Sequence, residues 1–297
     1  MLGFLPPHLR GPLLMIIAMS AFGTGDMLVK LMLTQESLPI YQVIAIRNSL
    51  LSLVMLALCL QSLGLEGLLS QLRRPLPWLF GVGEIGVAWP YLYSLKLLPL
   101  QTAQPVIKVA PLIGVVLTVL FFGQRAGLFR WLAVVCGFLG VLIVIEPWTG
   151  FQASGLVILP FTAALVLAVR DAFMSNSGGR VEPVVIGLTM SLAVLALGIV
   201  GSVLELDGPW QPLSAKGWWL VAPLAACAGF GYVFRSAAVL VAPYPVIAPF
   251  TYIGIVWAAV YGTLIFGDPL TAGQLAGSAL VIGGGLLLIW RQTVRPR

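Results

Sequence analysis

The sequence has little charge, one histidine and three cysteines, and these shortages exclude several classes of protein. Only 9% of the 297 residues are charged, whereas soluble domains carry about 25%. His8 is the sole histidine, and Cys59, Cys136 and Cys227 each stand alone in an apolar run, so no metal-type spacing exists. The sequence also contains no GxxxxGK[ST] motif and no nucleophile–base pair. We therefore expect no metal, no other cofactor, no direct use of ATP and no enzymatic activity.

Hydrophobic residues dominate the chain instead. They make up 60% of it, and the mean hydropathy is +1.04, so nearly every segment must lie in lipid or against another apolar helix. A membrane span needs about 20 mostly apolar residues. Runs of this kind predict ten transmembrane helices, at roughly 12–33, 40–60, 77–97, 102–122, 128–146, 153–173, 183–204, 217–239, 245–266 and 272–290. The predicted fold class is an all-α integral membrane protein.

The basic residues are scattered, so the net charge of +6 does not indicate a nucleic-acid partner. Their positions instead predict orientation, because short cytoplasmic loops are enriched in Lys and Arg. If the N-terminus is cytoplasmic, Lys216 is the only basic loop residue on the opposite side. The cytoplasmic ends and loops then carry Arg10, Arg73, Arg74, Arg125, Arg130, Arg180, Arg291, Arg295 and Arg297. Both termini are therefore predicted to be cytoplasmic.

The second half of the chain repeats the first at an offset of 144 residues (243 minus 99) without a gap. The matched residues are Pro99 and Pro243, Pro105 and Pro249, Leu120 and Leu264, Phe122 and Phe266, Gly123 and Gly267, and Gly140 and Gly284. Five spans per half is an odd number, so the halves must enter the membrane in opposite directions. We expect an inverted 5+5 repeat, with five-helix units over 11–148 and 153–291. Such repeats suit alternating access, with Pro105 and Pro249 as predicted hinges.

Several motifs resemble the EamA domain of the drug/metabolite transporter superfamily. The strongest are Ser94-Leu95-Lys96-Leu97-Leu98-Pro99, which leads to Pro111, and Phe122-Gly123-Gln124-Arg125. The second motif looks like the family's Leu-Gly-Glu-Arg turn, with Gln124 in place of the acid, and Arg47 resembles an arginine common in the second span. The resemblance covers about 11–146 and 155–290. It implies a ten-helix transporter of amino acids, nucleosides, vitamins, polyamines or other metabolites.

Charged residues at span depth are the candidates for a binding site. They are Asp26, Lys30, Arg47, Glu84, Lys96, Lys108, Arg170, Asp171 and Arg235. A charge near the bilayer centre costs at least about 2.5–3.5 kcal/mol, so we expect them to face the bundle interior, pair or reach the interface. For Lys96, Arg170 and Asp171, which lie near helix ends, snorkelling to the interface is an equally good explanation, and for Arg235 it is the better one.

The deeper cations predict a cavity for an anionic ligand. Lys30, Arg47 and Lys108 are expected to project into an outer-half cavity in which only Asp26 neutralises them. A ligand with carboxylates would complete the charge balance, and arginine offers a two-pronged donor that suits a carboxylate. Two plainer arrangements stay open. Asp26 and Lys30, four residues apart, could pair with each other, and Arg47 could form a packing bridge with Asp26 or Glu84.

Glu84 is the predicted proton-coupling residue because it has no basic neighbour at helical spacing, whereas Asp26 beside Lys30 is expected to stay ionised. Two sets of aromatic residues extend the predicted substrate site. Trp89 and Tyr93 share a helix face and could stack on an organic ligand, and Tyr232 with Arg235 occupies the equivalent inverted place. The same rings could instead pack between helices or sit at the membrane interface.

These observations favour a secondary transporter in a bacterial inner membrane. We expect it to export an amino acid or an amino-acid-derived metabolite with carboxylates, of which opine-type metallophores are one class. The expected partners are this metabolite and membrane lipid. The alternative is a lipid-linked sugar flippase of similar fold, which would need a lateral opening to lipid.

Overall fold

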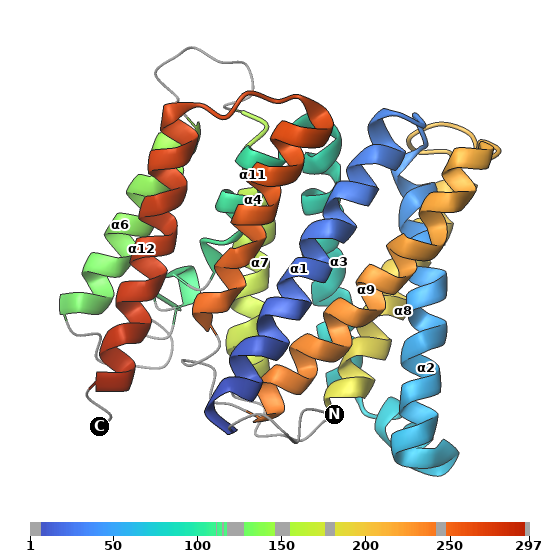
Figure 1. The fold of residues 1–297 in the computed structure, drawn as a ribbon. Coiled ribbons are helices and arrows are strands. Elements are labelled where there is room, and N and C mark those ends of the chain that lie inside the picture. Colours follow the sequence, from blue (N-terminus) through green and yellow to red (C-terminus); the bar gives the residue numbers. More distant parts are fainter. Residues whose placement is uncertain are drawn as a thin grey trace.

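The computed structural model describes residues 7–110, 112–114, 116–117, 128–145, 155–175, 182–241 and 248–294. Every named element in these ranges is a helix, which confirms the all-helical prediction (Figure 1). In chain order they are α1 (Pro7–Thr34), α2 (Ile40–Leu72), α3 (Pro75–Leu97), α4 (Leu100–Ile107), α6 (Leu128–Ile145), α7 (Ile158–Ser175), α8 (Pro183–Val203), α9 (Ala215–Val241), η3 (Ala248–Tyr252), α11 (Ile253–Phe266) and α12 (Ala272–Val294).

Local chemistry explains several boundaries. Pro75 and Pro183 stand in the first turn of α3 and α8, where proline fixes a helical φ and loses no hydrogen bond. The start of α2 is capped from another segment, because the Ile40 amide donates to Asp207 Oδ2 at 2.8 Å. At the end of α11, Gly267 adopts a φ of 66°, a left-handed conformation that glycine tolerates at a helix C-terminus.

Three helices differ from the predicted spans. α2 continues to Leu72, beyond the predicted end near residue 60, and kinks at Gly64, whose φ is 67°. The span predicted over 102–122 begins as α4 but breaks after Ile107. Its end, with the motif at 122–125, lies outside the described residues. The span predicted over 245–266 starts as the 3₁₀ helix η3 and becomes α-helical at Ile253.

Some of these helices are long and apolar enough to cross a membrane, which needs about 20 residues. Among the described residues, four stretches meet that condition: Leu9–Thr34, Ile40–Leu72, Val184–Val203 and Ala215–Arg235. Shorter apolar helices run over Val135–Val144, Phe250–Phe266 and Ala272–Gly284. The count of ten spans stays a prediction.

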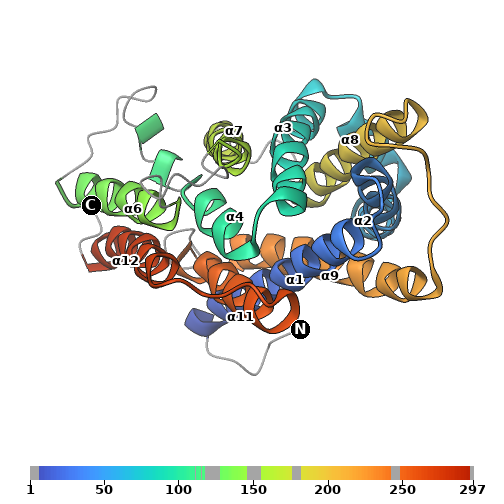
Figure 2. The ribbon, with the colours of Figure 1, turned by 90° about the horizontal axis from the view of Figure 1, so that it is seen from above.

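The helices form a bundle in which each half packs mainly against the other. The most extensive pairings join α6 to α12, α2 to α8 and α1 to α9, followed by α3 to α8 and α3 to α7. From above, α6 and α12 lie at one end of the bundle and α2 and α8 at the other (Figure 2). α1 begins and α12 ends at the same end of the bundle (Figure 1).

Contacts between individual residues fix the direction of each helix. In an antiparallel pair, the residue numbers in contact rise along one helix as they fall along the other. For the contacts of α1 with α9, this holds at Gly25–Cys227 and Phe22–Gly231. The other antiparallel pairs are α3 with α7 (Gly83–Arg170, Gly86–Val166), α2 with α8 (Ala45–Gly198, Met55–Gly187), α4 with α11 (Gln101–Gly262, Lys108–Gly254) and α6 with α12 (Gly140–Val281, Val144–Gly277). Parallel pairs are α1 with α3, through Asp26–Tyr91 and Lys30–Leu98, α1 with α11, through Ser20–Trp257 and Thr24–Tyr261, and α3 with α8, through Pro77–Thr189 and Gly81–Ala193.

The buried apolar clusters contain residues from both halves. One cluster joins Met32, Ile44 and Leu95 to Val194 and Leu224, and another joins residues of α2, such as Leu51 and Met55, to Val185 and Leu188 of α8. The backbones of α6 and α12 approach closely where two glycines meet: a Cβ on Gly140 would lie 2.6 Å from the Gly277 carbonyl oxygen. Small residues of this kind allow membrane helices to approach closely.

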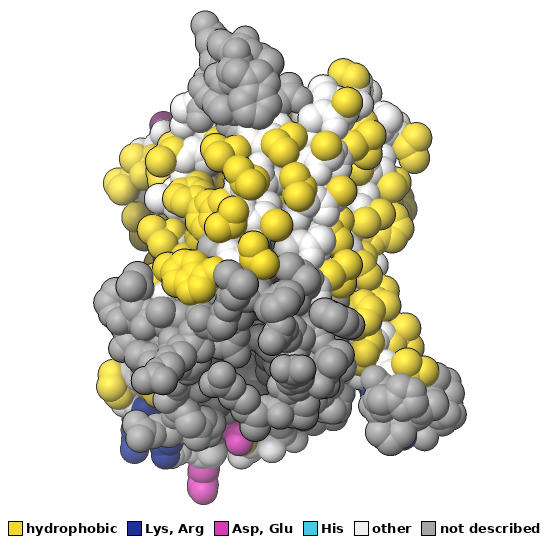
Figure 3. Space-filling view, turned by 90° about the vertical axis from the view of Figure 1, so that its left-hand side faces the viewer, with side chains coloured by type: hydrophobic (Ala, Val, Ile, Leu, Met, Phe, Trp, Pro, Cys, Tyr) yellow, Lys and Arg dark blue, Asp and Glu magenta, His cyan; other side chains and the backbone are white. Residues whose placement is uncertain are grey.

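The outer surface is apolar along the helices. Large hydrophobic side chains there are well exposed, among them Leu79 (62%) and Leu264 (78%). Viewed from the side of α6 and α12, apolar side chains spread over the described part of the face, and Lys and Arg side chains are visible at its lower end (Figure 3). Lipid is the solvent that suits such a surface.

Candidate functional site

Two interrupted helices meet in the middle of the bundle. α4 ends at Ile107, and the next residue, Lys108, caps it with φ −72° and ψ 1°. On the facing segment of the same chain, the 3₁₀ helix η3 ends at Tyr252 and α11 begins at Ile253. The 144-residue offset pairs Tyr252 with Lys108 (252 minus 108). The Lys108 side chain passes over Gly254, where a Cβ would lie 3.2 Å from Lys108 Cε. In transporters, discontinuous helices of this kind commonly form the substrate site.

Asp26 lies beside this break and is held by neutral donors. The Tyr91 hydroxyl donates to Asp26 Oδ2 at 2.7 Å, and Gln104 Nε2 donates to the same oxygen at 2.5 Å. Gln104 Nε2 also contacts the Tyr91 hydroxyl oxygen at 2.7 Å. Asp26 is only 8% exposed and Gln104 only 3%. Helices α1, α3 and α4 thus each contribute one polar side chain to a small buried cluster.

Two cations lie within electrostatic range of the cluster. Arg47, on α2, and Lys108 both attract the Asp26 carboxylate electrostatically. Among the ion pairs of the described residues, none includes Asp26, Arg47 or Lys108. Arg47 Nε is buried without a hydrogen-bond partner, and the polar contact of Lys108 Nζ is with Met19 Sδ, at 3.8 Å. The predicted group of Asp26, Arg47 and Lys108 is therefore brought together, with positive charge in excess.

Lys30 does not join this group. Its ammonium donates to the Leu98 carbonyl at 2.6 Å and lies 5.1 Å from the centre of the Phe266 ring. Helix α3 ends at Leu97 and Leu98 is extended, so this carbonyl is free to accept from Lys30. The ion pair of Asp26 with Lys30 that their spacing permits is not found among the described residues.

The predicted aromatic residues also lie apart from Asp26. Trp89 and Tyr93 stack on each other with ring centres 5.8 Å apart, and Trp89 Nε1 donates to the Tyr41 hydroxyl. Each is two residues from Tyr91, and two residues turn a helix by about 200°, so they leave α3 on the side opposite to Tyr91. A second stacked pair, Trp257 and Tyr261, faces α1, where Trp257 bonds Ser20 and Tyr261 bonds Thr24.

A second charged cluster joins α3 to α7 and α9. Arg170, whose side chain is 5% exposed, forms ion pairs with Glu84 and with Asp171. Arg235 lies 3.6 Å from Asp171, and the Tyr232 hydroxyl bonds Glu84 at 3.1 Å. We call these five residues the inner network, because they lie toward the predicted cytoplasmic ends of their helices. Arg170 is thus buried and paired rather than snorkelling.

The inner network changes the surroundings expected for two predicted residues. Glu84 has no basic neighbour on its own helix, but Arg170 reaches it from α7. Tyr232 contacts Glu84 and packs edge-on against Phe22, with ring centres 5.4 Å apart. Arg235 also lies close enough to Lys108 to repel its ammonium. The inner network and the Asp26 cluster are therefore electrostatic neighbours.

Lys96, the remaining charge at span depth, lies at the opposite end of the bundle. It forms an ion pair with Asp207 at 2.9 Å, and its side chain is 31% exposed. This agrees with an end-of-helix residue that reaches the interface.

Sequence reasoning missed Gln104 and Tyr91 as site residues, and it named Arg170 only among the charges that could instead reach the interface. One signal was available for each. Gln104 lies four residues before Lys108 and so shares its helix face. The 144-residue offset pairs Asp26 with Arg170 and Tyr91 with Arg235, which places charged or polar residues at equivalent positions of both halves.

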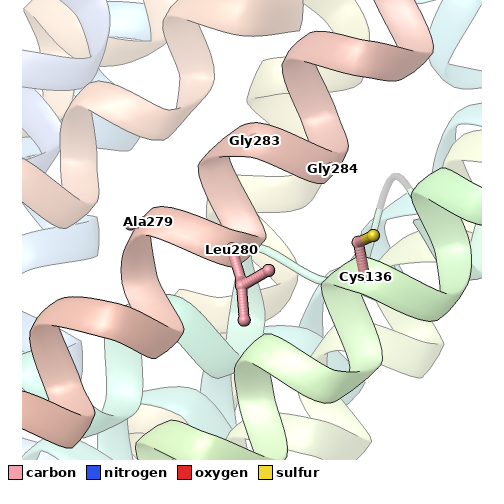
Figure 4. A pocket seen from close by; sticks show the side chains of 5 residues that line it. All are labelled: Cys136, Ala279, Leu280, Gly283 and Gly284. Atoms are coloured by element: carbon pink, nitrogen blue, oxygen red, sulfur yellow. The ribbon is translucent and has the colours of Figure 1, made fainter.

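A separate cavity lies between α6 and α12 (Figure 4). Its volume is about 260 Å³, and its walls are apolar apart from one thiol. The lining residues are Cys136, Ala279, Leu280, Gly283 and Gly284. None of the predicted site residues lines it, and it offers no group that would hold a charged ligand.

Comparison with known proteins agrees with this architecture. Residues 9–146 match the EamA-like transporter family. The chain is 25% identical over 280 residues to the pseudopaline exporter CntI of Pseudomonas aeruginosa, covering 92% of this chain and 93% of that one. It is 26% identical over 238 residues to a riboflavin transporter of Rhizobium johnstonii, covering 77% and 76%. A crystal structure with 20% identity shares the fold, with a TM-score of 0.63 over 95% of this chain.

An apolar helical bundle with a buried charged cluster at interrupted helices defines a membrane transport protein. Residues 9–146 carry the match to the EamA-like transporter family, and the named relatives of the chain are transporters.

Proposed function

We propose that the protein is an alternating-access exporter of an amino acid or an amino-acid-derived metabolite with carboxylates. The observation that carries this proposal is the pair of half-buried cations, Arg47 and Lys108, which act electrostatically on Asp26 and have no ion-pair partner among the described residues. A charge held at membrane depth without an ion-pair partner is costly. A carboxylate arriving between Arg47 and Lys108 would relieve that cost and would be released when the site opens to water.

The helix directions support the inverted repeat on which alternating access depends. α1, α3, α8 and α11 run one way, and α2, α4, α7 and α9 run the other. Each helix of the first half therefore opposes its counterpart in the second, including α6 and α12. We propose five-helix units over 11–148 and 153–291, with both termini in the cytoplasm of a bacterial cell and the bundle in its inner membrane.

The named relatives favour small organic cargo. One is a pseudopaline exporter, which supports export, and an opine-type metallophore remains our example of a carboxylated cargo. Others are named riboflavin transporters, so riboflavin is a second candidate. The stacked aromatic pairs at Trp89 and Trp257 would suit its flat ring system.

Metabolite profiling tests the proposal directly. Cells that lack the protein should accumulate one or more carboxylated metabolites, and the medium should lose them. Re-expression of the wild type, or of Lys216→Met as a control for a lysine outside the site, should restore export. Lys108→Met and Arg47→Gln should restore less than about a tenth of it, since each removes one cation that would bind the carboxylate.

Other profiles would point elsewhere. Accumulated riboflavin without any carboxylated compound would favour the second candidate. Altered lipid-linked sugars with unchanged metabolites would favour a flippase. Loss of equal amounts of transport in Lys216→Met and Lys108→Met would contradict the assignment of the site.

Glu84 is the proposed proton-coupling residue. Protonation would break its ion pair with Arg170 and free the inner network between α3 and α7. Transport by the wild type in membrane vesicles should therefore follow the imposed pH gradient, whereas transport by Glu84→Gln should not respond to it. Asp171→Asn, also a partner of Arg170, is the matched control. A Glu84→Gln protein that is as sensitive to the gradient as wild type would reject this role.

A further inference from the structure

The Gln104 amide has a free acceptor in the middle of the Asp26 cluster. Its Nε2 group donates to Asp26 Oδ2 and contacts the Tyr91 hydroxyl. The opposite orientation of the amide would set Gln104 Oε1 against the Asp26 carboxylate, and two acceptors repel each other. Oε1 therefore points away from Asp26, and it is buried without a hydrogen-bond partner.

The same cluster contains free donors. Arg47 Nε is buried without a partner, and Arg47 acts electrostatically on both Asp26 and Tyr91. The ammonium of Lys108 contacts only the weak acceptor Met19 Sδ among the described residues. A buried polar atom without a partner is energetically costly. A ligand that supplied an acceptor to Arg47 and Lys108 and a donor to Gln104 would recover this cost at both places.

A free amide oxygen alone does not make a binding site. Gln101, one turn earlier on α4, is also 3% exposed and also has a buried Oε1 without a partner. Its amide nitrogen donates to the Asp268 carbonyl at 3.3 Å, and its side chain packs on Gly262. Free cationic donors accompany the free acceptor at Gln104 and not at Gln101, and this makes Gln101 a matched control.

We infer that Gln104 determines specificity by accepting a hydrogen bond from a substrate nitrogen beside Asp26, while Arg47 and Lys108 bind an adjacent carboxylate. The substrate class is then an amino carboxylate, in which a protonated nitrogen stands next to the carboxylate. This inference rests on the proposed function and adds the group that Gln104 and Asp26 recognise. The Asp26 carboxylate balances the positive charge of the substrate nitrogen, and Arg47 and Lys108 balance the negative charge of the substrate carboxylate.

Matched probes that differ only at the nitrogen test this inference. One pair is L-glutamate and 2-hydroxyglutarate, and the other is iminodiacetate and oxydiacetate, with riboflavin as a probe that carries no carboxylate. Each is titrated against the purified full-length protein in lipid nanodiscs, and the rise in the unfolding temperature gives a half-saturating concentration. A site built to bond an N–H rejects an analogue that lacks it, so in at least one pair the nitrogen probe should bind at least about tenfold more tightly.

The variants assign the preference to one side chain. In Gln104→Leu the difference within the pair should fall below about twofold, because Oε1 is gone while the carboxylate-binding cations remain. Gln101→Leu should keep the wild-type difference. Gln104→Met, of similar volume, provides a second variant in case Gln104→Leu does not fold.

Three results would overturn the inference: equal binding within both pairs, stabilisation by riboflavin alone or by no probe, or a preference that survives in both Gln104 variants. Its failure can be told from that of the proposed function by the metabolite profiles. Export of an amino-acid-derived carboxylate that contains no nitrogen, such as a 2-hydroxy acid, would leave the proposed function intact and end this inference. Absence of any exported carboxylated compound would end both.

Discussion

Gly254 is the residue that leaves room for the Lys108 side chain at the meeting of the two interrupted helices. A Cβ there would lie 3.2 Å from Lys108 Cε and 3.3 Å from Gln104 Oε1. The space over Gly254 is therefore part of the proposed binding site, and side-chain volume at this position should act on transport more than on folding.

We predict that Gly254→Val lowers the rate of metabolite export at least about tenfold, because its methyl groups would enter the space that a ligand must share with Lys108. The rate is measured as efflux from loaded cells, with protein amounts matched by immunoblot. Gly155→Ala, at a position with nothing within 4 Å of the added carbon, is the control. Wild-type efflux by Gly254→Val would show that the ligand binds elsewhere.

At this scale, the sequence predicted the right residue types better than their partners. Asp26, Arg47 and Lys108 come together as expected, because buried charges must face the bundle interior. The partner of Lys30 was not predictable from helical spacing, because the Leu98 carbonyl becomes free only where α3 ends. Gln104 lacks charge and so was not among the charged residues considered at span depth.

The inner network illustrates how charge joins separate helices. Arg170 on α7 pairs with Glu84 on α3 and with its own neighbour Asp171. Breaking a buried ion pair by removing one partner typically costs about 3–5 kcal/mol, whereas replacing both partners with uncharged residues can be nearly neutral.

We predict that Arg170→Met lowers the unfolding midpoint of the purified protein in detergent more than the double variant Glu84→Gln with Arg170→Met does. The double variant leaves no uncompensated carboxylate at position 84. Circular dichroism during thermal unfolding measures both midpoints, and Lys216→Met serves as a control for loss of a positive charge. A double variant less stable than the single one would mean that Arg170 acts through packing, not through its charge.

Glycine contacts between α6 and α12 permit a second prediction about elements. Gly140→Ala should destabilise the protein by about 1–3 kcal/mol, the range for overpacking, because the added carbon would lie 2.6 Å from the Gly277 carbonyl oxygen. Gly283→Ala, on α12 but with nothing within 4 Å, should leave stability nearly unchanged. Equal unfolding midpoints for the two variants would contradict the close approach of these helices.

Helix existence was predictable from apolar runs, but the interruptions were not. The break after Ile107 falls within a predicted span. The signals for it are Pro105 and Pro111, and prolines also occur in unbroken membrane helices. The extension of α2 beyond Gly64 was not predicted, because its last turns are too polar to count as part of a span.

For the whole molecule, the helix directions indicate which loops share a side, and the basic residues predict which side is the cytoplasm. A green fluorescent protein fused after Arg297 or inserted after Glu182 should fluoresce, because this reporter folds in the cytoplasm. Alkaline phosphatase inserted after Gln211 should be active, since it requires the periplasm. Activity of the phosphatase at Glu182 would reverse the orientation that the basic residues predict.

The inverted repeat of the whole molecule stays a prediction, and it depends on repeated signals in the sequence. The 144-residue offset, the odd number of predicted spans and the uneven distribution of arginines each lead to an inverted repeat. Opposed helix directions in the two halves support the same plan. The pairing of helices between the two halves was not predictable from the sequence. The helices are nearly uniformly hydrophobic, so no face of a helix is marked as the one that packs against a partner.

The mixing of both halves in every large buried cluster has a consequence for biosynthesis. While the ribosome is still making the second half, residues such as Met32, Ile44 and Leu51 have no partners from α8 and α9 to pack against. Insertion factors or lipid must shield them until translation ends. A message truncated near its midpoint would therefore yield no durable fragment, only a substrate for membrane quality-control proteases.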